Sequence, residues 1–289
     1  MSLPVAAAVL FAALLHAGWN ALAKAIPHRL VASTLIGATY LVVGAVAVFF
    51  APAPASSSIA FIAASSIVQT VYLILLTASY SHGDFGQVYP LARGLSVLLV
   101  TLFSTFVLAE YLDLWQSVGV ALVIVSLMSL VFVRRSGRPS LGDGNSSSRR
   151  GILLALLTGV TIAAYSLIDG VGVRVSGSSI GYAAWLFVLQ GAMLVCTCYA
   201  MERDRKTFRS EMRRYLLRGL VGGAMSLVAY AIVLWGQSIA PLSLVSALRE
   251  TSVLLAGIIG FLFFGERLSV ARIAITVLAA IGIIIMQVG

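Results

Sequence analysis

Two arginines lie inside apolar runs that are far too long for soluble helices. Arg93 belongs to the segment Tyr89–Leu99. Arg249 holds the same place in Val245–Leu255, where Arg, Ser, Val, Leu and Leu recur in register 156 residues later. A charge in hydrocarbon is expensive, so both arginines should face protein or water. A guanidinium offers a planar fork of donors to carboxylate or phosphate, which makes each a candidate substrate contact; a salt bridge that locks two helices is the alternative.

Glu250 directly follows Arg249, so on a regular helix its side chain should point about 100° away from that of Arg249. Inside the membrane, Glu250 could carry a coupling proton or accept an ammonium group. Pairing with a basic neighbour is the alternative. For Arg249, a locking partner could be Asp169.

A second set of polar residues repeats at an offset of 149, which pairs His16 with Tyr165 and Asn20 with Asp169. Residues four apart share one helix face, so each pair should form a polar stripe. Two such stripes at matching depths predict a lined cavity, in which His16 or Asp169 could titrate during transport. Ordinary packing is the alternative for His16.

Aromatic residues in the apolar runs could complete this cavity, because aromatic walls suit amphipathic solutes. Packing within the core is the alternative for each ring. The candidates are Trp19, Tyr72, Tyr89, Tyr230 and Trp235.

The composition indicates an integral membrane protein. Hydrophobic residues make up 60% of the 289 positions and charged residues 10%, against about 25% charged in soluble domains. Apolar runs of about 20 residues predict spanning helices rather than barrel strands. Cys196 and Cys198 lie two apart and do not face each other on a helix, so we expect them to pack in the core. We expect no metal and no other cofactor.

Ten spans account for the apolar runs, and the fold class is therefore an all-α integral membrane protein. Residues 1–133 form a first five-helix repeat, 134–150 a cytoplasmic linker, and 151–289 a second repeat. Asp84, Asp113 and Ser269 should cap helices rather than act in catalysis. The expected spans are 3–23, 31–50, 59–80, 85–109, 114–133, 151–173, 179–200, 215–238, 242–264 and 268–288.

Charge placement predicts the orientation. Of the loop Lys and Arg residues, 16 lie on the side opposite the termini and one, Arg174, lies on the side of the termini. The positive-inside rule then puts both termini outside the cytoplasm of a cell membrane. The net charge of +9 is explained by these loops, so we expect no nucleic-acid partner.

Five spans per half is an odd number, so the second half enters the membrane in the opposite sense, which is an inverted repeat. Arg93 should lie roughly 12 Å from the cytoplasmic end of its span, and Arg249 a similar depth from the outer end. This predicts that the two arginines bracket a midplane cavity from opposite sides, too far apart to clamp one small phosphate.

Short motifs carry a family resemblance. The segment Gly265-Glu266-Arg267-Leu268-Ser269, with the looser Ala109-Glu110-Tyr111-Leu112-Asp113 in the first half, resembles the EamA group of the drug/metabolite transporter superfamily. The resemblance implies a ten-helix bundle that moves small metabolites, often amino acids. Its cavity would be lined by the first, third, fourth, sixth, eighth and ninth spans. Arg93 and Arg249 depart from the usual apolar, proline-containing fourth and ninth spans.

The first span adds a narrower resemblance. Residues 16–20, His-Ala-Gly-Trp-Asn, followed by Lys24, are similar to a subgroup of which some members accompany phosphonate-use genes. An organic anion is therefore a candidate cargo.

Together these observations predict a secondary transporter, not an enzyme, that exports amino acids or organic anions by alternating access. Its partners would be a small metabolite and membrane lipid, and a monomer should suffice. Protons could be the coupling ion, through Glu250, Asp169 or His16, and facilitated exchange without a coupling ion is the alternative. Efflux of amphipathic drugs or lipids is the alternative. An intramembrane phosphatase or transferase acting on lipid-linked phosphate is a remoter one, because the sequence lacks a clustered nucleophile, base and metal set.

Overall fold

The computed structural model describes residues 1–82, 85–132, 146–255 and 269–288, and within these ranges it is helical with no strand. Nine of the described helices are long and apolar enough to cross a membrane. They are α1 (Leu3–Lys24), α2 (Arg29–Phe50), α3 (Ile59–His82), α4 (Phe85–Phe106), α5 (Leu114–Ser129), α6 (Ser146–Val175), α7 (Ser179–Met201), α9 (Leu216–Ile239) and α12 (Val270–Val288). Shorter elements are η1 (Ser56–Ser58), η2 (Leu130–Phe132), α8 (Arg205–Arg214) and α10 (Leu242–Glu250).

The ninth predicted span, 242–264, begins as α10 and is described only as far as residue 255. Within that stretch the helix is interrupted. α10 ends at Glu250, Thr251 forms a turn, and helical residues resume at 252. Asp84, most of the linker 134–150 and the motif residues 265–268 lie outside the described residues.

The helices pair as an inverted repeat requires. A two-fold exchange would map α1 on α6, α2 on α7, α3 on α9, α4 on α10 and α5 on α12. It turns the α3–α6 pair into α9–α1 and the α2–α9 pair into α7–α3, while α2–α7, α4–α10 and α5–α12 map on themselves. All of these pairs are in contact. The two halves therefore interlock instead of packing as separate bundles.

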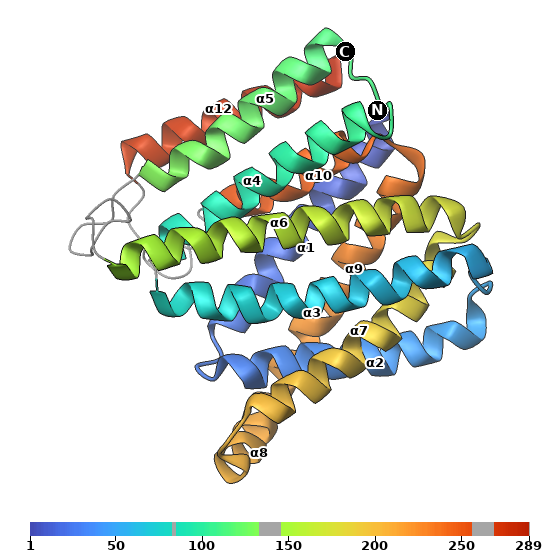
Figure 1. The fold of residues 1–289 in the computed structure, drawn as a ribbon, viewed down its shortest axis with the longest axis vertical. Helices are drawn as coiled ribbons and strands as arrows, with labels where there is room; N and C mark the ends of the chain where they lie inside the picture. Colours follow the sequence, from blue (N-terminus) through green and yellow to red (C-terminus); the bar gives the residue numbers. More distant parts are fainter. Residues whose placement is uncertain (83–84, 133–145, 256–268, 289) are drawn as a thin grey trace.

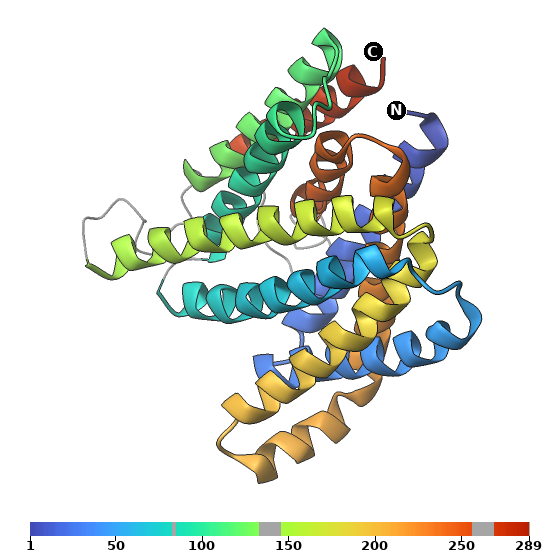
Figure 2. The ribbon, with the colours of Figure 1, turned by 45° about the vertical axis from the view of Figure 1, so that its right-hand side comes forward.

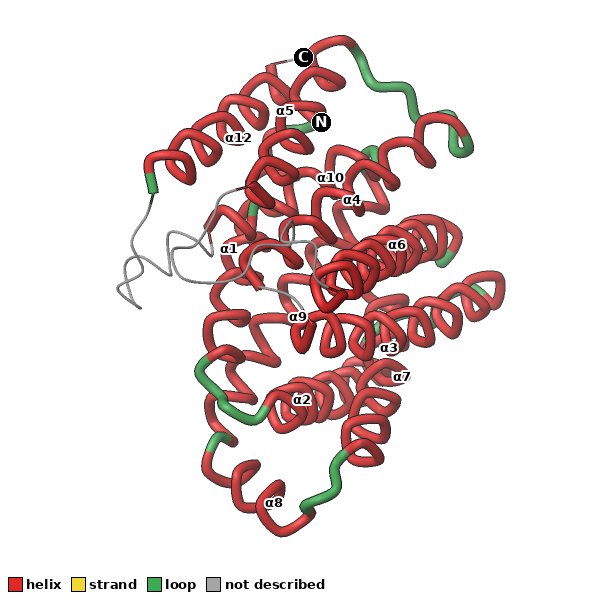
Figure 3. The backbone as a smooth tube through the Cα atoms, turned by 60° about the vertical axis from the view of Figure 1, so that its left-hand side comes forward, coloured by secondary structure: helices red, strands yellow, loops and turns green. Residues whose placement is uncertain are grey.

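The repeat axis passes between the two members of each pair that maps on itself, namely α2–α7, α4–α10 and α5–α12. α5 and α12 form a pair at one end, α8 lies at the opposite end, and α4, α6, α3 and α7 follow one another between them (Figure 1). The same order is visible from two other directions (Figures 2 and 3). Both termini lie close together, on the side away from α8 (Figure 1).

Glycines allow the closest helix contacts. A Cβ on Gly219 would lie 2.4 Å from the Leu35 Cβ, and one on Gly223 would lie 2.5 Å from the Thr39 Oγ1. The small residues at these positions let α9 pack closely against α2. Gly119 and Gly282 allow the same approach between α5 and α12.

Two of the predicted caps are present. The Gln116 N–H donates to Asp113 Oδ1 over 2.8 Å at the start of α5, and the Arg272 N–H donates to Ser269 Oγ over 3.3 Å ahead of α12. Pro241 is the N-cap of α10.

The basic stretch after α7 forms α8, whose N-cap is Asp204. Hydrogen bonds from Thr207 to the Asp204 carboxylate hold the pKa of that group below its ordinary value. Phe208 is buried against the end of α2, whereas Lys206 and Arg209 on the same helix are exposed. Phe208 and the partly buried Met212 thus anchor a helix whose remaining surface is mostly cationic.

Candidate functional site

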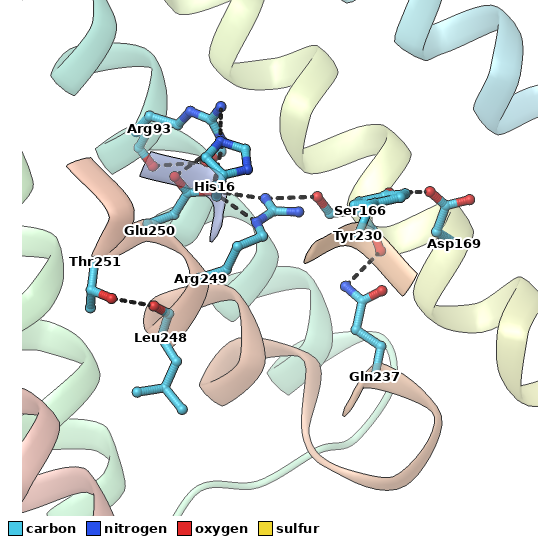
Figure 4. A network of polar contacts seen from close by, with 11 residues as sticks. His16, Arg93, Ser166, Asp169, Tyr230, Gln237, Leu248, Arg249, Glu250 and Thr251 are labelled. Atoms are coloured by element: carbon cyan, nitrogen blue, oxygen red, sulfur yellow. Dashed lines mark hydrogen bonds and ion pairs between the residues drawn. The ribbon is translucent and has the colours of Figure 1, made fainter. Parts of the chain in front are cut away.

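The two arginines and Glu250 form one buried cluster where α4 of the first half meets α10 of the second (Figure 4). Arg93 Nη1 donates to Glu250 Oε1 over 3.0 Å and to Oε2 over 3.1 Å. From α10 itself, Arg249 Nε and Nη2 donate to Oε1 over 3.0 and 2.8 Å. The exposed fraction is 3% for each arginine and 0% for Glu250.

This geometry corrects the expectation that Arg93 and Arg249 lie apart on opposite sides of a cavity. The backbone rise per residue gives the depth of each Cα atom along its helix but not the position of the guanidinium. The long side chains of both arginines reach the same carboxylate, because α4 and α10 are in contact at the repeat axis. Two cations from opposite halves of the chain therefore converge on one point.

The orientation of Glu250 also differs from the expectation. In a regular helix its side chain would diverge from that of Arg249, yet the two form an ion pair. α10 ends at Glu250, and the Thr251 hydroxyl donates to the Leu248 carbonyl over 2.6 Å at the break. A discontinuous membrane helix at the midplane is typical of substrate and ion sites in secondary transporters.

Arg249 is not paired with Asp169, the locking partner considered from sequence. Its Nη2 instead donates to Ser166 Oγ on α6 over 3.2 Å. Ser166 lies three residues before Asp169, so the serine connects the arginine cluster to the polar stripe of α6 (Figure 4).

α1 contributes His16 to the arginine cluster. His16 Nε2 lies 3.4 Å from Arg93 Nη2, and the Trp19 ring contacts the His16 ring edge-on at 5.1 Å between centroids. Asn20 does not join them, because its Nδ2 donates back to the His16 carbonyl over 2.7 Å. The Tyr89 ring lies 5.0 Å from Arg93 Cζ, within the range of a cation–π contact.

Asp169 is the centre of a second polar network, built from neutral donors. Tyr182 on α7 donates to Oδ1 over 2.8 Å, Tyr230 on α9 donates to Oδ2, and Gln69 Nε2 on α3 donates to Oδ2 over 3.3 Å. Gln190 extends the network by donating to Gln69 Oε1 over 2.5 Å. Asp169 has an exposed fraction of 0%.

Three tyrosines connect the two centres. Tyr165 lies 5.7 Å from Tyr72 and 6.4 Å from Tyr230 between ring centroids, and 5.9 Å from Arg249 Cζ. Trp235 is not part of this aromatic wall: it is five positions after Tyr230 on α9, which turns it to the exposed face of the helix, where 38% of it is accessible.

The sequence prediction missed several polar partners, namely Ser166, Tyr182, Gln69 and Gln190. The glutamines did carry a signal, because an amide inside an apolar run needs a partner. Ser166 and Tyr182 carried none, since serine and tyrosine are common in membrane helices and their partners are distant in sequence.

An ion pair between Arg174 and Glu110 holds the loop that connects α9 to α10. Arg174 at the end of α6 pairs with Glu110, and its Nε and Nη2 donate to the carbonyls of Gln237 and Ala240, each over 2.9 Å. Glu110 Oε2 accepts the Leu242 N–H over 2.8 Å. These contacts fix the start of α10 and hence the position of Arg249 and Glu250.

The interlocked halves and apolar spans define a multi-pass helical membrane protein. A solved structure described only as a crystal structure of a protein superposes on this chain with a TM-score of 0.75, at 16% sequence identity and over 98% of each chain. That likeness shows a shared fold. No curated protein matches the sequence.

Residues 149–288 match the EamA-like transporter family. This match over the second half of the chain supports the resemblance that Gly265–Ser269 indicated, and it is consistent with an EamA-type transporter of the drug/metabolite transporter superfamily. The matched region contains Arg249, Glu250 and Asp169. The family is one of transporters rather than enzymes. Arg93 and Arg249 converge on Glu250, so they are not too far apart to clamp one small phosphate, contrary to the prediction. The family match, rather than the spacing of the arginines, therefore favours a transporter over an enzyme that acts on phosphate.

Proposed function

We propose that this protein transports small anionic or zwitterionic metabolites, with amino acids and organic anions as the leading classes, by alternating access of its two halves. The observation that carries the proposal is the shared Glu250. A carboxylate already occupies the space between Arg93 and Arg249, which supports a cargo carboxylate or phosphonate as its competitor.

Charge favours such a competitor. The cluster of Arg93, Arg249 and Glu250 has a formal charge of +1 inside a buried region. The Arg93 Nε is buried and has no hydrogen-bond partner among the described residues, so a donor remains for an incoming anion. A monoanionic group would both neutralise the cluster and use this donor.

The position of the cluster suggests how binding is coupled to movement. Arg93 belongs to the first half, and Glu250 and Arg249 belong to the second, so the Arg93–Glu250 pair holds the halves together. A cargo carboxylate that displaces Glu250 from Arg93 would replace this ion pair between the halves with contacts from both halves to the substrate. The halves could then reorient around the bound cargo.

Several finer features belong to the same proposal. The basic surface of α8 lies away from the termini (Figure 1), which supports termini on the outer side of a cytoplasmic membrane. The proposed division into repeats 1–133 and 151–289, joined by the linker 134–150, would let a monomer function. Export is favoured over uptake by family analogy alone. Single-cysteine labelling at Ser2 and Ser210 from either side of intact cells tests the orientation.

The function itself is tested by a thermal-shift screen of the purified protein against amino acids, organic acids, phosphonates and amphipathic cations. A ligand that binds only the folded state raises the melting temperature. We expect a carboxylate or phosphonate to stabilise the wild type, and Arg93→Ala and Arg249→Ala to lose that response. The best compound is then used in counterflow with proteoliposomes.

The matched control is Arg214→Ala, which removes an arginine that is 71% exposed on α8. It should keep the full ligand response. Variants must elute as monodisperse protein with unchanged helical circular dichroism before the response is compared. If folded Arg93→Ala and Arg249→Ala keep the response, the arginines serve only to lock helices and the anion site is rejected.

One observation favours a second candidate, transport of amphipathic drugs or lipids. An apolar groove of about 570 Å³ opens between α4 and α6. It is lined by Leu99, Leu102, Phe103, Val160, Ala163, Ala164, Leu167 and Ile168. If amphipathic cations stabilise the protein and Ala164→Phe abolishes that effect, this function replaces the first.

A further inference from the structure

Asp169 is a buried acid that the arginine cluster does not use. Its carboxylate accepts hydrogen bonds from Tyr182, Tyr230 and Gln69, all of them neutral donors. In the part of the chain that the structure describes, no ion pair includes Asp169, whereas Glu250 has two cationic partners. A buried carboxylate without a cation is a group that can take up a proton.

The buried charges balance one another. Across the described ranges, the charged side chains classed as buried are Arg93, Asp169, Arg249 and Glu250, and their formal charges cancel. An anion that entered alone would neutralise the cluster of Arg93, Arg249 and Glu250 but leave the negative charge of Asp169 uncompensated, which is costly in a low dielectric. A proton that entered with the anion would restore neutrality.

We propose that Asp169 is a proton-binding site that loads together with an anion at the Arg93–Arg249 pair, so that one proton accompanies a cargo of one net negative charge. A zwitterion would load without a proton. The step converts the Asp169 carboxylate to a carboxylic acid with a proton from water, and no other bond changes. The inference rests on the proposed function for its anion, but the proton site can be tested separately.

The network gives protonation a structural consequence. Ionised Asp169 draws donors from α3, α7 and α9 onto α6, and α3 is the only one of these from the first half. A carboxylic acid accepts weaker hydrogen bonds and must itself donate one. The longest contact, 3.3 Å from Gln69, should weaken first and loosen α3 against α6.

Other groups face Asp169 from every packed element. Tyr182 and Tyr230 touch it from α7 and α9, and α3 contributes the amide of Gln69 and the hydroxyl of Ser65. α10 contributes Arg249 through Ser166, and α4 contributes Arg93 on the far side of Glu250 (Figure 4). Gln190 Oε1 is buried without a partner among the described residues, which leaves an acceptor at the end of the network.

Infrared difference spectroscopy of the full-length protein tests the proton site directly. Between pH 9 and pH 5 we expect a carbonyl band of a buried carboxylic acid to appear in the wild type. Asp169→Asn should lose that band, and Asp113→Asn, which replaces an exposed helix cap with another good cap, should keep it. If Asp169→Asn leaves the buried-acid band unchanged, or no such band appears, Asp169 is not the proton site.

The coupling is tested with two probes of fixed charge, ethanesulfonate as a monoanion and 2-aminoethanesulfonate as a zwitterion. Ethanesulfonate should bind the wild type at least tenfold more tightly at pH 5.5 than at pH 8.5, measured by thermal shift. Asp169→Asn, which is permanently neutral, should bind it at both pH values with less than a twofold difference. The affinity for the zwitterion should not depend on pH in either protein.

These outcomes separate the two proposals. Equal binding of ethanesulfonate by the wild type at both pH values leaves the arginine site in place and overturns the coupling. A buried-acid band that depends on Asp169, together with no ethanesulfonate binding even in Asp169→Asn, keeps the proton site but overturns its link to an anion. If Asp169→Asn does not fold, Tyr230→Phe serves in its place, because it removes one donor to the Asp169 carboxylate. This variant should shift the pH at which the buried-acid band appears, and an unchanged pH contradicts the inference.

Discussion

Two buried carboxylates in this transporter are satisfied in opposite ways. Glu250 lies between two arginines, whereas Asp169 accepts hydrogen bonds from two tyrosines and a glutamine. Both have an exposed fraction of 0%, so burial does not distinguish them. The difference is that Glu250 compensates surplus positive charge, while the hydrogen-bond donors to Asp169 are all neutral dipoles. Removal of the charge should therefore be damaging at Glu250 and tolerable at Asp169.

The largest effect is expected for Glu250→Gln. This change leaves Arg93 and Arg249 buried side by side without a counter-ion, and loss of one member of a buried ion pair typically costs about 3–5 kcal/mol. The free energy of unfolding in mixed micelles with increasing dodecyl sulfate measures it. Glu211→Gln makes the same chemical change on α8 outside the site, and we expect it to change stability by less than about 0.5 kcal/mol.

A second substitution tests the reason for that loss. Glu250→Gln combined with Arg93→Gln leaves one buried cation where Glu250→Gln alone leaves two. The double variant should be more stable than the single one. If it is less stable, the cost of Glu250→Gln comes from lost packing rather than from uncompensated charge, and the contrast with Asp169 disappears.

Arg93→Ala alone should destabilise less, by about 2 kcal/mol, the range for a hydrogen bond to a charged group. Arg249 remains to pair with Glu250, so no charge is left without a partner. The same unfolding measurement applies, with Arg214→Ala as the control. A loss as large as that of Glu250→Gln would mean that Arg249 cannot neutralise Glu250 by itself.

The sequence predicted this site only in part, for physical reasons. Arg93, Arg249, Glu250 and Asp169 could be recognised because a charge in an apolar run needs an explanation wherever its partner lies. The pairing of helices could be predicted from the repeat. Convergence of the two arginines could not, because it depends on side-chain reach at the α4–α10 crossing and on the break at Thr251.

For Asp169, the sequence predicted the position of the residue but not its hydrogen-bond partners. Its position followed from the repeat offset, but its partners Tyr182 and Gln69 lie 13 and 100 residues away and are brought together only by helix packing. Asn20, its counterpart in the first half, hydrogen-bonds its own helix instead. The inverted repeat thus conserves the backbone arrangement while the two halves use matching positions differently.

The tyrosines around Asp169 should contribute moderately. Tyr230→Phe and Tyr182→Phe each remove a hydrogen bond to a buried carboxylate, with an expected loss of about 1.5 kcal/mol. In Asp169→Asn the same tyrosine changes should cost about half as much, because a neutral acceptor forms weaker bonds. A double-mutant cycle on the unfolding free energies checks this. No coupling between Tyr230 and Asp169 would show that the tyrosines only pack.

The smallest effect is expected at the connection between the two carboxylate sites. Ser166→Ala removes the hydroxyl that accepts a hydrogen bond from Arg249 Nη2. It should lower the free energy of unfolding by about 1 kcal/mol or less, because Arg249 keeps its ion pair with Glu250. Ser243→Ala is the matched control, since the Ser243 hydroxyl is also buried but has no partner among the described residues; it should be neutral or slightly stabilising. The informative quantity is the coupling of Ser166→Ala to Asp169→Asn in a double-mutant cycle. Positive coupling would mean that the cation-paired and dipole-stabilised carboxylates sense each other through one turn of α6, and strict additivity would mean that they act as independent centres.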